Sequence, residues 1–266
     1  MPRSIVTIGT KAYCAGYFSD SIDVIDISPG DSGKPVAFAL QTAKPVTKLR
    51  MGERYFYDAS ICFQGWQTCH SCHPFTRPDG LNWILNSPST SAPKNSKSML
   101  FSWWTPPTSW AGKRLSAGGG TGSIRAGISA ELFTEPNEDV AVGLDTFFMQ
   151  MKPMSSPYLI YGRLSEAAQR GKKLFNDSAK VDCINCHSSS LYTDKKFHNA
   201  QIPDPFDANK NWDTPSLIEA WRTAPYSHLG IYEKTEDMIK QPGHSKKAGS
   251  LSSGELSDLV LFILSL

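Results

Sequence analysis

The chain has 266 residues, a net charge of +2, and enough aromatic side chains, including seven Trp and thirteen Phe, to build buried cores. Its length favours two modules of ordinary size, and the near-neutral charge argues against a polyanionic partner such as nucleic acid. No run of about eighteen apolar residues occurs, so the sequence predicts no membrane span.

The first thirty residues follow a strand pattern. The segment KAYCAGYFSDSIDVIDIS contains two apolar stretches separated by a Ser-Asp turn, and its second stretch alternates through Ile22, Val24, Ile25 and Ile27. This pattern predicts a β-hairpin within residues 1–30. An isolated pair of strands is marginal in water, so the hairpin should pack on the domains that follow it, pair with a partner's sheet or belong to a longer protein. It resembles the last hairpin of a Tyr-Val-Thr-Asn type β-propeller blade, which implies a β-propeller domain or subunit as a neighbour.

Two Cys-x-x-Cys-His units carry the strongest signal in the chain. The first lies in QTCHSCHPF, Gln67–Phe75, and the second in DCINCHSS, Asp182–Ser189. A redox dithiol has no use for a His directly after each pair, and a zinc site drawn from both pairs would leave both histidines unexplained. Covalent haem attachment uses every residue, because two thiols add to the haem vinyl groups and the adjacent His becomes the proximal iron ligand.

The sequence therefore predicts two haem c groups. The attachment cysteines and proximal histidines are Cys69, Cys72 and His73 for the first haem and Cys183, Cys186 and His187 for the second.

A helix is predicted just before each unit. Ser165 is a suitable N-cap for SEAAQRGKKLF, and RMGERYFY makes a similar lead-in to the first unit. The repeat of helix, loop and attachment unit predicts a mainly α fold with two tandem cytochrome c-like domains, residues 48–157 and 158–266. The boundary falls in KPMSSPYLIYG, where Pro and Ser cluster. The closing LSDLVLFILSL predicts a core helix, since it is too short to span a bilayer.

The longer patterns of the second half are SEAAQRGKKLF, CINCHSSSLYTDKKFHN, DTPSLIEAWRTAPYSHLG and LSSGELSDLVLFILSL, and the first half contains TPPTSWAGKR. With these segments the chain resembles the bacterial diheme cytochrome c peroxidase and methylamine-utilisation (MauG-like) diheme enzyme family. The resemblance implies two haem domains that face each other, one haem collecting electrons and the other meeting substrate, which in the peroxidases is hydrogen peroxide.

Two side chains are similar to functional positions of that family. Trp110 matches the tryptophan that lies between the haems and relays electrons; the alternative is an ordinary core Trp. Glu131, in GISAELF, falls where the family has the acid that cleaves peroxide, which is general acid–base work. The alternative is a first-turn glutamate stabilised by the dipole of a helix that begins at SAEL.

The chain also departs from the family pattern. Ala111 stands where Asp is usual, and Phe148 and Met149 stand where a Glu and an Arg are common. The loop that supplies a capping His in some peroxidases reads ILNSPSTSAPKNSKSML here and contains none. The first haem is then either open on its distal face, as catalysis requires, or capped by another side chain such as Met99.

For the second haem the distal ligand has two candidates. His244, in QPGHSKKAG, would give a low-potential bis-His iron, and Met238, in TEDMIK, would give a higher-potential His/Met iron. By resemblance, His198 and His228 form hydrogen bonds and do not bind iron. His70 lies inside the first attachment unit, where we expect it to be exposed to solvent.

Two further expectations concern a metal and a crosslink. The resemblance implies a calcium ion between the domains, held by carbonyls near Thr223 and Pro225, although no acidic or Asn partner is evident in the sequence. Cys14 and Cys62 could form a disulfide outside the cytoplasm; two small buried thiols are the alternative.

Haem c attachment places the protein in the periplasm or another extracytoplasmic space. No signal peptide is visible, so we expect a mature form, a fragment or half of a split gene. As an enzyme the protein would reduce hydrogen peroxide at the first haem with electrons from a redox partner protein. As a carrier it would be an electron-transfer subunit of a larger complex, and a homodimer is also conceivable.

Overall fold

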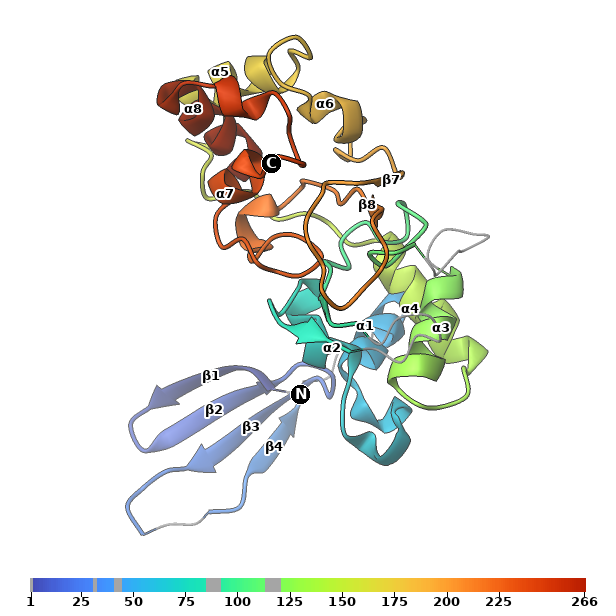
Figure 1. The fold of residues 1–266 in the computed structure, drawn as a ribbon. Helices are drawn as coiled ribbons and strands as arrows, with labels where there is room; N and C mark the ends of the chain where they lie inside the picture. Colours follow the sequence, from blue (N-terminus) through green and yellow to red (C-terminus); the bar gives the residue numbers. More distant parts are fainter. Residues whose placement is uncertain (1, 31–32, 41–44, 85–91, 113–120) are drawn as a thin grey trace.

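The computed structural model describes residues 2–30, 33–40, 45–84, 92–112 and 121–266. The molecule is elongated, with an N-terminal sheet at one end and helices α5 and α8 at the other (Figure 1). The α-helices are α1 Lys48–Tyr57, α2 Cys69–Cys72, α3 Thr121–Glu131, α4 Glu138–Met149, α5 Glu166–Phe175, α6 Cys183–Cys186, α7 Thr235–Lys240 and α8 Ser253–Leu264. The strands are β1 Pro2–Ile8, β2 Lys11–Gly16, β3 Ser21–Asp26, β4 Val36–Ala39, β5 Asn82–Trp83, β6 Lys94–Asn95, β7 Phe197–His198 and β8 Trp212–Asp213.

The first half of the chain forms a helical core from α1, α3 and α4. The Thr47 hydroxyl caps α1 by accepting from Arg50 N–H, so one of the free N–H groups at the helix start is satisfied. α1 and α4 cross where both helices carry glycine, and a Cβ added to Gly52 would lie 1.8 Å from the Gly143 carbonyl oxygen. This close crossing leaves the largest side chains of the core, such as Phe56, fully buried.

The second half forms a separate core from α5, α7 and α8. α5 and α8 also cross at a glycine, since a Cβ on Gly171 would lie 1.9 Å from the Asp258 carbonyl oxygen. Ser252 and Glu255 form a capping box at the start of α8, and Phe262 lies buried in the core at the end of the same helix. α8 is therefore the core helix that the apolar C-terminal segment predicts.

The predicted hairpin is present but is only the centre of a larger sheet. β2 and β3 pair as expected, and β1 and β4 add to their outer edges to give an antiparallel sheet in the order β1-β2-β3-β4. The expected boundary at residue 30 was therefore wrong, because the sheet continues to Ala39. The outer strands satisfy edge backbone groups that a lone hairpin would leave unpaired.

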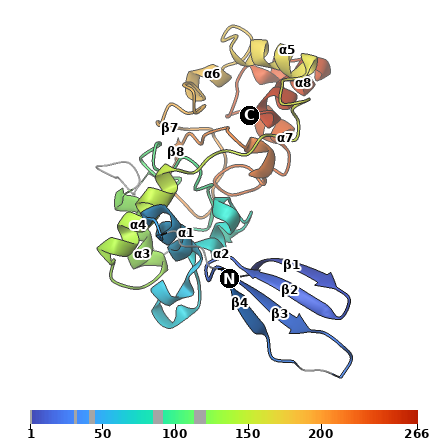
Figure 2. The same ribbon diagram turned by 180° about the vertical axis from the view of Figure 1, so that it is seen from behind.

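The sheet stands away from the helices in both ribbon views (Figures 1 and 2). It touches them at the β2–β3 turn, where the Arg50 guanidinium of α1 lies 3.8 Å from the centre of the Tyr17 ring and also donates to the Tyr17 carbonyl oxygen. Large apolar side chains such as Ile5 and Phe38 remain more than half exposed on this sheet.

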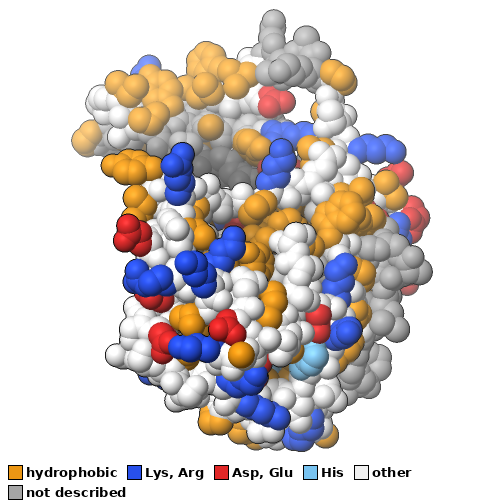
Figure 3. Space-filling model, turned by 90° about the horizontal axis from the view of Figure 1, so that it is seen from above, with side chains coloured by type: hydrophobic (Ala, Val, Ile, Leu, Met, Phe, Trp, Pro, Cys, Tyr) orange, Lys and Arg blue, Asp and Glu red, His pale blue; other side chains and the backbone are white. Residues whose placement is uncertain are grey.

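Within the described ranges, no helix has both the length and the apolar character needed to cross a membrane. Seen from the end that carries α5 and α8, Lys and Arg side chains are spread over the surface (Figure 3). This view agrees with the exposed positions of Arg170, Lys172 and Lys173 on α5.

The two halves meet along segments that lie far apart in sequence. Asn95 of β6 donates its backbone N–H to the His228 carbonyl oxygen at 2.8 Å, and Asp213 of β8 donates to the Trp110 carbonyl oxygen at 2.8 Å. The Lys97 ammonium also pairs with the Asp213 carboxylate, at 2.5 Å. The stretch between β6 and Trp110 is thus held against loops of the second half.

Candidate functional site

Both Cys-x-x-Cys-His units have the same local structure. Each Cys-x-x-Cys is a single helical turn, α2 in the first half and α6 in the second. The next residue closes the turn, as His73 N–H donates to the Cys69 carbonyl oxygen at 3.0 Å and His187 N–H to the Cys183 carbonyl oxygen at 2.9 Å. In such a turn, side chains three and four residues apart share one face. Both cysteines and the histidine of each unit therefore belong to one compact group.

The two cysteine pairs do not come together as a joint zinc site, and their thiols are protonated in the absence of a bound group. Burial raises the pKa of Cys69 to about 12 and that of Cys183 to about 12, whereas a redox-active or zinc-binding thiol needs its thiolate form. The one group of three or more metal-binding side chains among the described residues is Cys186, Asp194 and His198. This group does not join the two cysteine pairs.

The remaining two cysteines do not form the expected disulfide. Cys14, in β2, and Cys62, before the first attachment turn, are both buried free thiols. Cys62 packs into the first helical core, so each of the two behaves as a small apolar side chain.

The second site contains two buried imidazoles that face each other. His187 is 8% exposed, and its Nδ1 lies 3.0 Å from the Tyr192 carbonyl oxygen. Because a carbonyl only accepts, Nδ1 carries the proton and the other ring nitrogen keeps its lone pair for a metal. Burial, followed by the neighbouring His244, lowers the pKa of His187 to about 4, so the ring is neutral at pH 7.

The His244 ring lies close to the His187 ring. The two ring centres are 6.2 Å apart with an interplanar angle of 64°, and the buried Nδ1 of His244 has no hydrogen-bond partner. Two imidazoles bound to one metal at about 2 Å each would have ring centres about 6 Å apart. Burial also lowers the pKa of His244. The pair therefore fits the axial ligands of an iron between them.

Met238, the other distal candidate, lies in α7 close to the same histidine. Its backbone carbonyl is close enough to the His244 imidazole to raise the pKa of that ring, against the larger effect of burial. The side chain that faces His187 is the His244 ring. The described contact of Met238 with His244 is therefore through the Met238 backbone.

The first site differs on the far side of its attachment turn. His70 is half-buried, with its ring centre 4.6 Å from that of Tyr57, and its Nδ1 accepts the Phe75 N–H at 3.0 Å. The expectation of an exposed His70 was therefore wrong. The side chain packs among aromatic rings and holds the turn that contains His73.

Two predicted distal residues lie beside this first turn. Met99 donates its backbone N–H to the Thr76 carbonyl oxygen at 3.0 Å and packs with Cys69 against the first core. The backbone carbonyl of Glu131 accepts a hydrogen bond from the Gln67 side chain. Glu131 ends α3 and does not begin a helix, so the dipole explanation for this residue was wrong, since a helix C-terminus does not stabilise a carboxylate.

Trp110 lies where the two halves meet. Its indole N–H donates to the Asn95 carbonyl oxygen at 2.7 Å, and its ring stands edge-on to His228 with centres 6.4 Å apart. Trp212 also contacts His228, because its ring stacks on the imidazole with the ring centres 3.9 Å apart. Sequence reasoning missed Trp212, because nothing in its local pattern indicates that it shares a histidine with Trp110.

The two remaining histidines lie close to carboxylates, and His198 forms the hydrogen bond that the family resemblance implies. His198 lies 2.7 Å from an oxygen of Asp194, and the buried His228 lies 3.2 Å from an oxygen of Asp204. Burial lowers the pKa of His228 to about 4, although the Asp204 carboxylate acts in the opposite direction.

Asn95 is a further residue that sequence reasoning missed. The side chain is 5% exposed, its Nδ2 donates to the Pro225 carbonyl oxygen at 2.6 Å, and its Oδ1 is buried without a hydrogen-bond partner. An amide oxygen and nearby carbonyls are the ligand types that calcium takes. Asn95 thus brings a buried amide oxygen close to Pro225, where the local sequence contains no acidic or Asn residue.

Comparisons with known proteins agree with this picture. The Cytochrome c family model matches residues 168–266. The methylamine utilization protein MauG of Methylophilus methylotrophus is 26% identical, over 88% of this chain and 87% of that protein. The cytochrome-c peroxidase IdrP2 of Pseudomonas sp. (strain SCT) is 21% identical, over 98% of this chain and 89% of the peroxidase.

Similarity also extends to hydrazine synthase. Its subunit gamma from Kuenenia stuttgartiensis is 24% identical, over 82% of this chain and 77% of that subunit. A solved structure of Kuenenia stuttgartiensis hydrazine synthase, pressurized with xenon, matches with a TM-score of 0.70 and 22% identity, covering 100% of both chains. The two folds are therefore alike from end to end.

Proposed function

We propose that this member of the MauG-like diheme cytochrome c peroxidase family passes electrons between two haem c groups in tandem modules, residues 48–157 and 158–266. When bound, the haems supply one-electron redox chemistry at iron. The observation that carries the proposal is the unequal surroundings of the two attachment units. His187 has a second imidazole 6.2 Å away, whereas the candidates near His73 are a thioether and a carboxylate.

In this proposal the second site is the electron-transfer site. Cys183 and Cys186 would attach the haem, and His187 and His244 would bind its iron. The buried positions of both rings keep them neutral and exclude water, and two imidazole ligands favour a low reduction potential. Trp110, between the halves, is the candidate relay toward the first site.

The first site, with Cys69, Cys72 and His73, is then the place for substrate chemistry. The chain has six histidines; His70, His198 and His228 are engaged with aromatic rings or carboxylates. That arrangement supports an uncapped distal side, where Glu131 would move a proton on hydrogen peroxide. Met99 is the side chain that would close this side in a carrier.

A second function, an electron-transfer subunit of a larger periplasmic complex, is favoured by the N-terminal sheet. Its two faces both carry apolar side chains, because Ile5 and Val6 are neighbours in β1 and are 66% and 55% exposed. Strands that are apolar on both faces are typical of a sheet covered on both sides. The match to hydrazine synthase subunit gamma supports a multi-subunit setting, and the covering partner would be another β-sheet, such as a propeller, or a second copy of the chain.

Two measurements test this assignment. A pyridine-haemochrome spectrum should give two covalent haems per chain, and no covalent haem would refute the proposal. Low-temperature EPR of the oxidised protein should then show one low-spin and one high-spin ferric haem. Two low-spin signals would select the carrier, with Met99 as the residue to replace next. A calcium ion at Asn95 and Pro225 would be detected by metal analysis of the native protein.

A further inference from the structure

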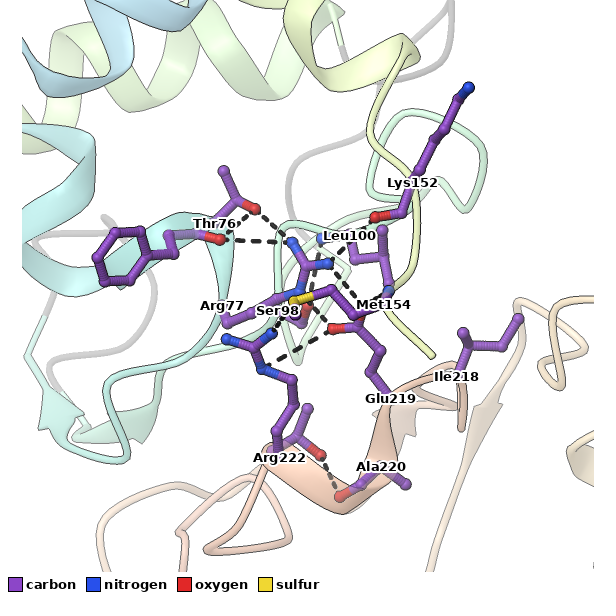
Figure 4. Close-up of polar contacts among 12 residues, drawn as sticks. Thr76, Arg77, Ser98, Leu100, Lys152, Met154, Ile218, Glu219, Ala220 and Arg222 are labelled. Atoms are coloured by element: carbon purple, nitrogen blue, oxygen red, sulfur yellow. Dashed lines mark hydrogen bonds and ion pairs between the residues drawn. The ribbon is translucent and has the colours of Figure 1, made fainter. Parts of the chain in front are cut away.

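A buried ion pair links the first attachment segment to the second half of the molecule. The Arg77 guanidinium contacts the Glu219 carboxylate through two bonds, Nε to Oε2 at 2.5 Å and Nη2 to Oε1 at 2.7 Å. The Arg77 side chain is 8% exposed and that of Glu219 is fully buried. Two parallel charged bonds fix direction as well as distance, so the pair holds one orientation between the halves (Figure 4).

On its first-half side, Arg77 holds the turn that follows His73. Phe75 and Thr76 both have left-handed backbone angles, with φ of 51° and 68°, which is unfavourable for residues with a Cβ and most unusual for a β-branched one. The Arg77 guanidinium also donates to the Thr76 hydroxyl and to the Phe75 carbonyl oxygen, at 3.4 Å in the second case. Arg77 thus stabilises the shape of the segment that carries the first proximal histidine.

Besides Arg77, Glu219 contacts two further parts of the chain. Its carboxylate accepts the Met154 N–H at 2.5 Å from the segment after α4, and its own N–H donates to the Leu266 carbonyl oxygen at 3.0 Å. Glu219 follows Pro215 by four residues, and the Pro215 backbone lies near enough to the His187 ring to raise its pKa, against the larger effect of burial. Arg77 likewise follows His73 by four residues. The ion pair therefore joins the segment that follows His73 to the segment that follows Pro215, which lies near His187.

We propose that Arg77 and Glu219 are positioning residues that couple the two haem sites. The bidentate contact sets how the His73 segment sits on the His187 segment, and its two opposite buried charges act on both reduction potentials. In a poorly solvated interior, neutralising one member of the pair would leave the other charge uncompensated, and that charge would shift the reduction potential of a nearby redox centre. The inference rests on the proposed haem assignment and adds a residue pair that controls communication between the sites.

The test compares four variants in the haem-loaded protein. Glu219→Gln leaves a buried guanidinium uncompensated and should raise the reduction potentials, while Arg77→Gln should lower them. The R77Q/E219Q double variant should lie between the two. The matched control is Asp258→Asn, which breaks the Arg170–Asp258 pair; that pair is also bidentate, at 2.7 and 2.8 Å, but its Arg170 side chain is 59% exposed. The control should leave both potentials unchanged.

Spectroelectrochemistry gives the two potentials, and circular dichroism in the Soret band reports the relative orientation of the haems. Shifts of opposite sign in the two single variants support the proposal. Shifts of the same sign, or none, in proteins with two covalent haems overturn it. That outcome leaves the proposed function standing, because the haem count of the unmodified protein tests the function separately.

If the single variants do not fold, the apolar double variant R77L/E219M takes their place, since apolar replacement of a buried ion pair is often tolerated. Its Soret circular dichroism should change relative to the unmodified protein. An unchanged Soret signal together with unchanged potentials would overturn the coupling role.

Discussion

The two halves of the molecule build the same attachment unit and then differ on the far side of the histidine. Each places Cys-x-x-Cys on one helical turn beside a glycine-mediated helix crossing. In the second half a loop before α8 returns His244 to face His187. In the first half His70 is the additional histidine, and it packs among aromatic rings of its own turn. A local motif thus sets the predicted place of haem attachment, while a distant loop decides whether a second imidazole lies near the proximal histidine.

The largest expected effect is loss of a haem from one half. The double variant C183S/C186S should reduce the haemochrome yield to half and remove the low-spin EPR signal, because thioether bonds require both thiols. C69S/C72S should also halve the yield but remove the high-spin signal. The reverse pattern of signals would invert the comparison of the two sites.

The next effect separates the two distal candidates of the second haem. His244→Ala should convert the low-spin haem to high-spin, since the closing imidazole is removed, with the proximal His187 unchanged. Met238→Ala is the control and should keep the low-spin spectrum. EPR of the oxidised proteins reads both, and a spin change in the Met238 variant alone would transfer the ligand role to that thioether.

The glycine crossings test whether the two cores are equally tight. Gly52→Ala and Gly171→Ala should each lower the free energy of unfolding by about 2–3 kcal/mol, because the added Cβ would overlap a backbone carbonyl. Gly254→Ala, in α8 with open space around its Cβ position, should be neutral or stabilising by about 0.5–1 kcal/mol. Denaturant titration measures the free energy of unfolding of all three variants. An unchanged free energy of unfolding in the Gly171 variant would argue against the close α5–α8 crossing.

The smallest effect concerns His228, between the halves. Its pKa falls from 6.5 in the unfolded chain to about 4 in the fold, chiefly through burial. The unfolded state therefore binds more protons between these values, so stability is full above pH 6.5 and declines as the pH falls toward 4. Between pH 7 and pH 5 the loss should be about 1–2 kcal/mol.

His228→Gln is the comparison for this effect. Removing the titrating ring should remove this part of the pH dependence, even if the variant is less stable at pH 7. Equal slopes of stability against pH for the two proteins would show that His228 does not titrate in this window.

The predictable part of the structure follows short-range chemistry. The helix α5, its Ser165 cap and the one-turn attachment helices depend on residues within a few positions of each other, so spacing and capping rules find them. The extent of the N-terminal sheet was underestimated because β1 and β4 take their role from pairing with the hairpin edges, which no local pattern encodes.

Two of the missed residues, Asn95 and Arg77, share one property, which is that their hydrogen-bond partners lie more than a hundred positions away. Asn95 bonds the Pro225 carbonyl, and Arg77 bonds Glu219 across 142 positions. A polar side chain in a loop has no periodicity that separates an exposed position from a buried, paired one. Only the packed fold shows that these side chains are enclosed together.

The sequence by itself determined two Cys-x-x-Cys-His units and, through them, the prediction of haem attachment with a proximal histidine in each, because that chemistry needs only neighbouring residues on one turn. The tertiary structure alone decided which ring faces His187, what surrounds His70 and how Arg77 meets Glu219. Those arrangements depend on loops returning across the molecule, and their positions are set by helix crossings and buried charge pairs that form only when both halves fold against each other.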